Sequence, residues 1–241
     1  MKNFFYLFLC SVLVFGGCSA EQEPGMLADE AGILTDETAE YSIDSYTYNV
    51  DYKNIHPSQR KDALQIPDET LKKMTTKAVI QAVFDYPMLI EIFLANDFIR
   101  GFNGVLGDNN AYIELGKRDN AFRLLLERLL DDGEKIELTS GSYILQYVIT
   151  LPQYLSFYNA AEMKILVETI FKKHDLQQKE VINSISIVAI GRTMLAANYT
   201  PFVNAVNENP SLQLFINSVH IPYIFDYEII IDCGINFINE K

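Results

Sequence analysis

The sequence predicts an all-α protein: an irregular array of short helices punctuated by prolines, with a strand-like extended segment near residues 46–52. Apolar residues make up 49% of the 241 residues, which is enough for a packed core. From residue 66 onward, apolar side chains recur at helical spacing. X-Pro pairs interrupt this pattern without a fixed period, so a regular helical repeat is not indicated.

Residues 1–17 have the pattern of a signal peptide. Lys2 precedes the apolar run Phe4–Phe15, which is shorter than the ~20 residues needed to cross a bilayer. The following quartet, Phe15-Gly16-Gly17-Cys18, resembles a bacterial lipobox, although Phe15 stands where leucine is usual. The resemblance implies cleavage before Cys18 and a diacylglyceryl group on its thiol. An ordinary secretory signal with an incidental cysteine is the alternative.

Lipid on Cys18 would make the membrane a partner of this protein. Each buried methylene contributes ~0.8 kcal/mol, so several acyl chains such as palmitate hold a protein stably. We expect a bacterial cell-envelope location. The outer membrane or cell surface is favoured, because residues 19–23 resemble the acidic export signal of surface lipoproteins. Cys10 would leave with the signal peptide and Cys233 would stay alone, so no disulfide is expected.

Residues 18–52 are expected to form an acidic tether that includes the extended segment. Nine carboxylates and no Lys or Arg lie between residues 19 and 52, and we expect a flexible spacer up to about residue 45. From Tyr46 to Tyr52 apolar and polar residues alternate, which is typical of a strand. We expect its tyrosines to pack on the protein's own domain, which should occupy residues 53–241 as a single helical unit.

Helix starts in this domain carry recognisable capping residues. We expect Pro67 to open a helix over 68–74 and Thr75 to cap the next, with Val79, Ile80, Val83 and Phe84 inward. Short apolar helices are expected at 88–95 and 98–106, and Asp119 is expected to cap a helix over 120–130 that Gly133 ends.

The second half of the chain follows the same rules. Pro152 should break the helix over 143–150, and Asn159 with Glu162 forms a capping-box pattern. Residues 181–197 are apolar on all sides, which is typical of a buried central helix. Thr200-Pro201 and Asn209-Pro210 each predict a cap followed by a first-turn proline. Residues 223–238 fit either a strand or a helix capped by Asp226, and helix is favoured.

One stretch of the helical part resembles a family. The segments Ile66-Pro67-Asp68-Glu69-Thr70-Leu71, Met74-Thr75-Thr76, Tyr86-Pro87-Met88-Leu89-Ile90 and Gly101-Phe102-Asn103 look like an uncharacterised family of bacterial secreted proteins and lipoproteins. The resemblance covers residues 66–130 clearly and the rest faintly. It implies an all-helical body and carries over no site residue.

Charge and composition exclude some functions. The net charge of −13 repels nucleic-acid phosphates, so no nucleic acid is expected as a partner. The three histidines, His56, His174 and His220, are far apart, and no cysteine pair or ligand cluster predicts a metal or other cofactor. Cys233 is expected to be an unreactive, buried thiol.

Two short motifs and one arginine are the candidates for chemistry. Ser58 and Lys61 match the S-x-x-K motif, but its companion motifs are absent. Residues 107–110 with Glu114 offer oxygens that could hold calcium, although their composition is more typical of a turn. Arg192 interrupts the most apolar helix, so it contacts carboxylates or carbonyls, binds an anionic ligand in a cleft, or is exposed. Whether the protein is an enzyme is left open.

The pattern as a whole favours a lipid-anchored binding domain. An anchor and a tether precede a domain without a recognisable catalytic set, so we expect non-covalent binding of another envelope protein. Carbohydrate is less favoured as the ligand because the chain has no Trp, although its 14 Tyr could substitute. The rivals are an assembly component and an envelope hydrolase whose site forms only in three dimensions, from His174, His220, Arg192 and nearby carboxylates. The oligomeric state is open.

Overall fold

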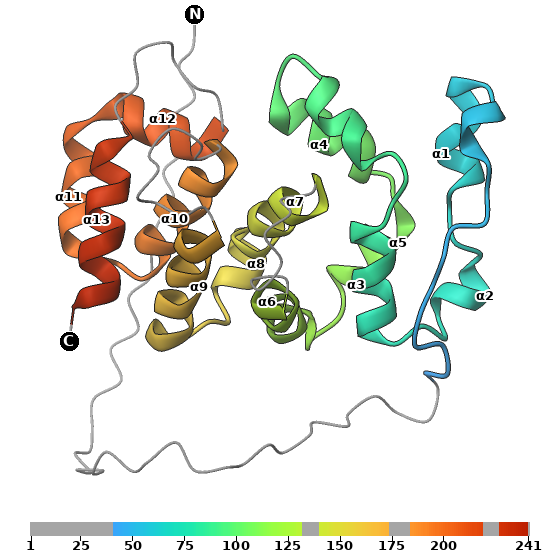
Figure 1. Cartoon of the computed structure of the whole chain (residues 1–241), viewed down its shortest axis with the longest axis horizontal. Coiled ribbons are helices and arrows are strands. Elements are labelled where there is room, and N and C mark those ends of the chain that lie inside the picture. The colour runs from blue at the N-terminus through green and yellow to red at the C-terminus, as the bar shows by residue number, and fades with distance from the viewer. Residues whose placement is uncertain (1–40, 132–139, 174–183, 219–226, 241) are drawn as a thin grey trace, which may run out of the picture. The chain divides into compact units, whose positions relative to one another are not determined.

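A computed structural model describes residues 41–131, 140–173, 184–218 and 227–240. Of the residues in these ranges 72% are helical, so the all-α prediction is confirmed (Figure 1). The first half contains η1 (Tyr52–Asn54), η2 (Pro57–Gln59), α1 (Arg60–Ala63), α2 (Asp68–Leu71), α3 (Thr76–Phe84), η3 (Leu89–Leu94), α4 (Phe98–Leu106), α5 (Asn110–Leu115) and α6 (Ala121–Asp131). The second half contains α7 (Ser140–Ile149), α8 (Pro152–Leu155), α9 (Ala160–Lys173), α10 (Ser184–Ala196), α11 (Thr200–Glu208), α12 (Pro210–Ser218) and α13 (Glu228–Asn239).

The predicted caps set several of these boundaries. Thr75 Oγ1 accepts a hydrogen bond from Ala78 N at 3.2 Å, and α3 then buries the apolar face expected of it. Asn159 and Glu162 exchange the two bonds of a capping box, at 2.8 and 2.9 Å, and the Asn209 side chain accepts from Leu212 N at 3.2 Å. These local signals were therefore sufficient to predict where α3, α9 and α12 begin.

One helix start and one helix end differ from the prediction. Thr200 is the first residue of α11 instead of its cap, since Tyr199 precedes the helix with no side-chain cap bond. The helix after Pro67 is α2, which ends at Leu71 instead of residue 74, because the chain turns there to bring Met74 beside Ile43. Gly133 and Asp226 lie outside the described ranges.

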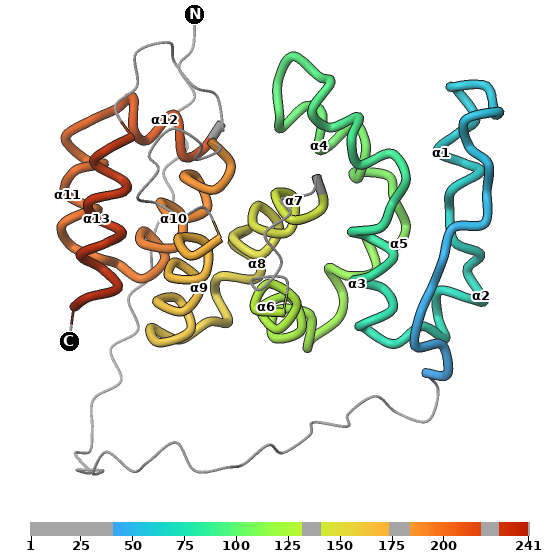
Figure 2. Tube along the Cα trace, viewed as in Figure 1, coloured from blue at the N-terminus to red at the C-terminus, as the bar shows by residue number. Residues whose placement is uncertain are grey.

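The first described segment, residues 41–52, lies against the helices without forming a strand. Ile43 and Met74 make an isolated parallel bridge, in which Lys73 O accepts from Ile43 N at 3.0 Å and Ile43 O accepts from Thr75 N at 2.9 Å. The Tyr48 hydroxyl donates to Ala82 O at 3.1 Å, which fixes the segment to α3. Figure 2 traces it as the blue tube beside α2.

The extended segment expected near 46–52 is non-helical up to Asp51 and pairs with no strand, because no neighbouring strand is available among the described residues. The alternation nevertheless predicts which side chains face the protein. Tyr46, Tyr48, Val50 and Tyr52 are partly buried against the core, and the residues between them are exposed. The prediction that these tyrosines pack on the protein's own domain is confirmed.

The helix α10 lies at the centre of the second half, as its uniformly apolar sequence predicts. It packs against α7, α9, α11, α12 and α13, and most of its side chains are buried. α7 contacts α10 on one side and α3, η3 and α6 on others, so it joins the two halves into one hydrophobic cluster. The helix favoured for the tail is confirmed as α13 from residue 228 onward.

Candidate functional site

The lipidation site falls outside the described part of the chain. Cys18, the signal peptide over 1–17 and the tether up to residue 40 are not covered, and neither are His174 and His220. None of the helices that the structure does describe has the length and apolar character needed to cross a bilayer. The anchor at Cys18 therefore stays a prediction from sequence.

Arg192 lies half-buried on α10 and contacts a backbone carbonyl, which was one of the alternatives predicted for it. Its Nε donates to Ile216 O at 3.1 Å, and its Cζ lies 4.7 Å from the centre of the Tyr147 ring. A carbonyl and an aromatic face together stabilise a guanidinium that is largely removed from water. Arg192 lines neither of the two pockets described below.

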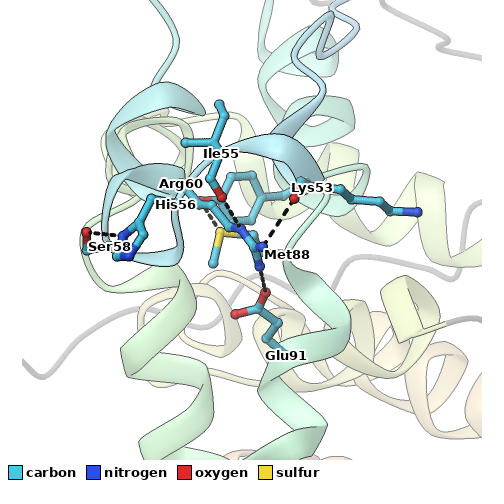
Figure 3. A network of polar contacts seen from close by, with 8 residues as sticks. Lys53, Ile55, His56, Ser58, Arg60, Met88 and Glu91 are labelled. Carbon is cyan, nitrogen blue, oxygen red and sulfur yellow. Dashed lines mark hydrogen bonds and ion pairs between the residues drawn. The ribbon is translucent and has the colours of Figure 1, made fainter.

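The S-x-x-K motif does not form a serine–lysine pair. Lys61 Nζ lies 4.0 Å from an Asp108 carboxylate oxygen. Ser58 Oγ lies 2.8 Å from His56 Nδ1, as Figure 3 shows. The same Nδ1 accepts from Ser58 N at 3.4 Å, so His56 caps the short helix η2. Both side chains are exposed, and the pair is a local capping contact and not an activated nucleophile.

Figure 3 also shows what Arg60 does beside this cap. Its guanidinium donates to Ile55 O at 3.1 Å and to Lys53 O at 3.4 Å, and it lies 4.0 Å from a Glu91 carboxylate oxygen. These contacts tie the loop before α1 to η3. The network therefore has a structural role.

The candidate calcium loop at residues 107–110 is a helix start. The Asn109 side chain caps α5 by accepting from Tyr112 N at 2.9 Å. The Asn110 amide accepts from Ile66 N at 3.1 Å and donates to Ile66 O at 2.6 Å, so its oxygen is engaged. Across the residues that the structure describes, no group of three or more His, Cys, Asp or Glu side chains is arranged to hold a metal ion.

Cys233 is a half-buried free thiol on α13. Burial, followed by the negative charge of Asp232, raises the pKa of Cys233 above its ordinary value. A raised pKa lowers the thiolate fraction, and the thiolate is the reactive form. The expectation of an unreactive thiol is consistent with this environment.

One surface pocket, of about 410 Å³, lies between α3 and α6, and its charges are largely paired. Lys77 Nζ lies 3.8 Å from a Glu127 oxygen, and Arg128 Nη2 lies 3.6 Å from an Asp85 oxygen. Arg128 also lies over the Phe84 ring at 5.3 Å. Because each cation has a partner, we assign these groups to holding α6 against α3.

A second pocket, which we call the aromatic pocket, has a different composition. Its volume is about 390 Å³, and it lies between the α5–α6 connection and α8. It is lined by Gly116, Lys117, Arg118, Asp119, Phe122, Gln153, Tyr154, Ser156 and Phe157. The volume is at the lower end of the roughly 300–1,000 Å³ typical of small-ligand sites.

Two stacked rings form the apolar part of the aromatic pocket. Phe122 and Phe157 lie with centroids 5.1 Å apart and planes at 19°. Phe157 is 60% exposed, a high value for so large an apolar side chain, whereas Phe122 is partly buried in the core cluster. Tyr158 fixes the arrangement, because its hydroxyl donates to Phe122 O at 2.5 Å.

The polar groups of the aromatic pocket divide into a rim and a floor. Lys117, Asp119, Gln153 and Ser156 lie at the rim, and all four are exposed. Tyr154 is buried in the floor, where its hydroxyl has no hydrogen-bond partner among the described residues.

Glu114 balances the positive charge of this region. It pairs with Arg118 Nε at 2.8 Å and Lys117 Nζ at 3.5 Å. The Arg118 side chain is only 7% exposed, and the Tyr41 ring covers it, 4.4 Å from Cζ. With Asp119 included, the two cations and two anions cancel, so this pocket has no marked charge despite the acidity of the whole chain.

Two large apolar side chains on η3, Ile90 and Leu94, are exposed. Leu94 is 76% exposed, the highest value for a large apolar side chain in the described ranges, and Ile90 on the same short helix is more than half exposed. We call Ile90 and Leu94 the η3 surface. The aromatic pocket and the η3 surface were both missed by the sequence analysis, because helical periodicity does not reveal which apolar residues stay outside the core.

No family model, curated protein or solved structure matches the chain. The resemblance of residues 66–130 to a family of bacterial lipoproteins therefore stays a prediction.

Proposed function

We propose that the protein is a lipid-anchored lipoprotein of the bacterial cell envelope whose helical domain binds another envelope protein without catalysing a reaction on it. The observation that carries the proposal is the sequence of the first 18 residues. An apolar run of signal-peptide length ends at Gly16-Gly17-Cys18, and an acidic stretch without Lys or Arg follows. The anchor would hold the domain at a membrane, and the acidic stretch would keep it clear of anionic lipid.

The η3 surface supports binding of a protein. Large apolar side chains left in water at one place on a folded domain are typical of contact sites for other proteins. Leu94 and Ile90 lie on η3, where Arg60 and Glu91 fix the neighbouring loop, so the surface is held in place before a partner arrives.

Metabolic labelling tests the anchor. Cells given a clickable fatty acid should incorporate it into the wild-type protein and not into the Cys18→Ala variant, because the variant lacks the accepting thiol. Protease added to intact cells should degrade the wild-type domain if it lies on the cell surface. An unmodified mature terminus beginning at a residue other than 18, measured by intact mass, would contradict the anchor.

Site-specific photocrosslinking tests the partner. A photoreactive residue at Leu94 should give a discrete protein adduct in living cells, because the η3 surface faces the partner. The matched control is Leu214 on α12, which is 58% exposed and should give no discrete adduct. The Leu94 adduct should disappear when Cys18→Ala is added. Equal labelling from both positions would count against a specific partner at η3.

A further inference from the structure

The aromatic pocket combines an apolar surface with neutral hydrogen-bonding groups. The exposed Phe157 ring lies on Phe122, so its orientation is fixed before any ligand arrives. An aromatic face is negative at its centre and attracts the weakly positive C–H bonds of a ligand. A ligand with a flat C–H surface would therefore bind here without reorganising the pocket.

The rim supplies both donors and acceptors of hydrogen bonds. Gln153 has an amide that donates and accepts, Ser156 has a hydroxyl that does both, and Asp119 accepts. Groups of both kinds match a ligand that carries several hydroxyls. Because Glu114 pairs with Lys117 and Arg118, and Asp119 lies beside them, the rim has no excess charge to select an ionic ligand.

From these features we infer that the aromatic pocket binds a neutral saccharide of one or two rings, with the C–H face of one ring on Phe157 and its hydroxyls on Gln153, Ser156 and Asp119. The site lies on the α5–α6 connection and α8, and the inference does not rest on the lipid anchor or on the η3 surface. It adds a glycan contact to the proposed protein partner.

A peptide fits the pocket less well. A peptide that binds by strand addition needs an exposed strand edge, and the described residues contain no strand. The volume of about 390 Å³ also limits the ligand to a short unit. A saccharide at the end of a glycan needs no strand edge and is small enough for this volume.

The absence of Trp from the chain allows a direct test. Phe157→Trp places the only indole of the protein in the aromatic pocket, and Leu214→Trp places it at a similarly exposed position on α12. The full-length protein is kept in a polyoxyethylene detergent, which has no sugar headgroup. It is titrated with maltose, cellobiose and N,N′-diacetylchitobiose to roughly 20 mM, since a ligand this small gains little affinity per atom and a Kd on the order of 1 mM is expected.

At least one of the three sugars should change the indole emission of the Phe157→Trp protein saturably and leave the emission of the Leu214→Trp control unaffected. Adding Gln153→Ala to the Phe157→Trp protein should weaken binding of that sugar by about tenfold, because one or two hydrogen bonds are lost. Circular dichroism on each variant verifies that the helices persist.

Saturation-transfer NMR on unlabelled sugar provides a second measurement that introduces no tryptophan. The sugar signal should be present with the wild type and with Leu214→Ser, and should be lost with Phe157→Ser. No saturable response to any of the three sugars by either method would overturn the inference. So would preferential binding of the apolar peptide acetyl-Leu-Phe-amide at the same indole. Either result would leave the tests of Cys18 and Leu94 unaffected, because those tests measure other sites.

Discussion

At the scale of single residues, two buried tyrosine hydroxyls should contribute differently to the free energy of unfolding. Tyr154 and Tyr158 are both buried beside the aromatic pocket. The Tyr158 hydroxyl donates to Phe122 O, whereas the Tyr154 hydroxyl has no partner among the described residues. A buried hydroxyl without a partner loses its bonds to water and gains nothing in exchange.

The pair Tyr154→Phe and Tyr158→Phe tests this difference. Tyr154→Phe should leave the free energy of unfolding unchanged or raise it, because an uncompensated polar atom is removed. Tyr158→Phe should lower it by about 1 kcal/mol, since a hydrogen bond is lost and the Phe122 carbonyl loses this donor. Urea unfolding followed by circular dichroism measures both. A larger loss for Tyr154→Phe than for Tyr158→Phe would contradict the assignment.

At the scale of elements, α4 approaches η3 through a glycine. A Cβ built on Gly101 would lie 2.3 Å from Ile92 O and 2.9 Å from Ala95 Cβ, which is closer than atoms can pack. Gly104, one turn later on the same helix, is exposed and has nothing within 4 Å of such a Cβ. A substitution at Gly101 therefore tests close packing, and a substitution at Gly104 tests helix propensity.

Alanine substitution should have opposite effects at these two positions. Gly101→Ala should destabilise the protein by about 1–3 kcal/mol, because α4 must move away from η3. Gly104→Ala should stabilise it by about 0.5–1 kcal/mol, since alanine loses less backbone entropy in a helix. Thermal unfolding of the two variants beside the wild type provides the measurement. A stabilised Gly101→Ala would show that the approach of η3 to α4 is looser than described.

The elements also show how far the sequence could predict this fold. Local sequence patterns predicted the start of a helix correctly where a side chain caps the first turn of that helix, as at Thr75 and Asn159. At residues 46–52 the alternation predicted which side chains are buried, but it could not show whether a partner strand exists. Exposure of Phe157 and Leu94 could not be predicted either, since each depends on how distant helices meet.

For the whole molecule, the burial of tyrosines predicts sensitivity to alkali. Burial raises the pKa of Tyr112 to about 12, and it raises the pKa values of Tyr48, Tyr154 and Tyr158 as well. The fold therefore favours the neutral phenol, and the unfolded chain, with ordinary values near 10, loses its protons first. The contribution to stability is complete below pH about 10 and is lost as the pH rises through the folded pKa values.

Spectroscopic titration measures this dependence. Phenolate absorbance from Tyr48, Tyr112, Tyr154 and Tyr158 should rise only as helical circular dichroism is lost, because burial raises the pKa of each of these phenols. Below pH about 10 the ionisation of tyrosines should cause no change in stability with pH. A single phenolate transition completed while the helices are intact would contradict the burial of these side chains.

The Ile43–Met74 bridge has a mechanical consequence. A force pulling on the chain before residue 41 reaches the helices first through Tyr41 on Arg118 and through the hydrogen bonds that Ser42 and Ile43 make with Lys73 and Thr75. A few bonds at one point resist tension less well than a ladder of many. The segment should therefore detach from the helices at low force while the helices stay folded.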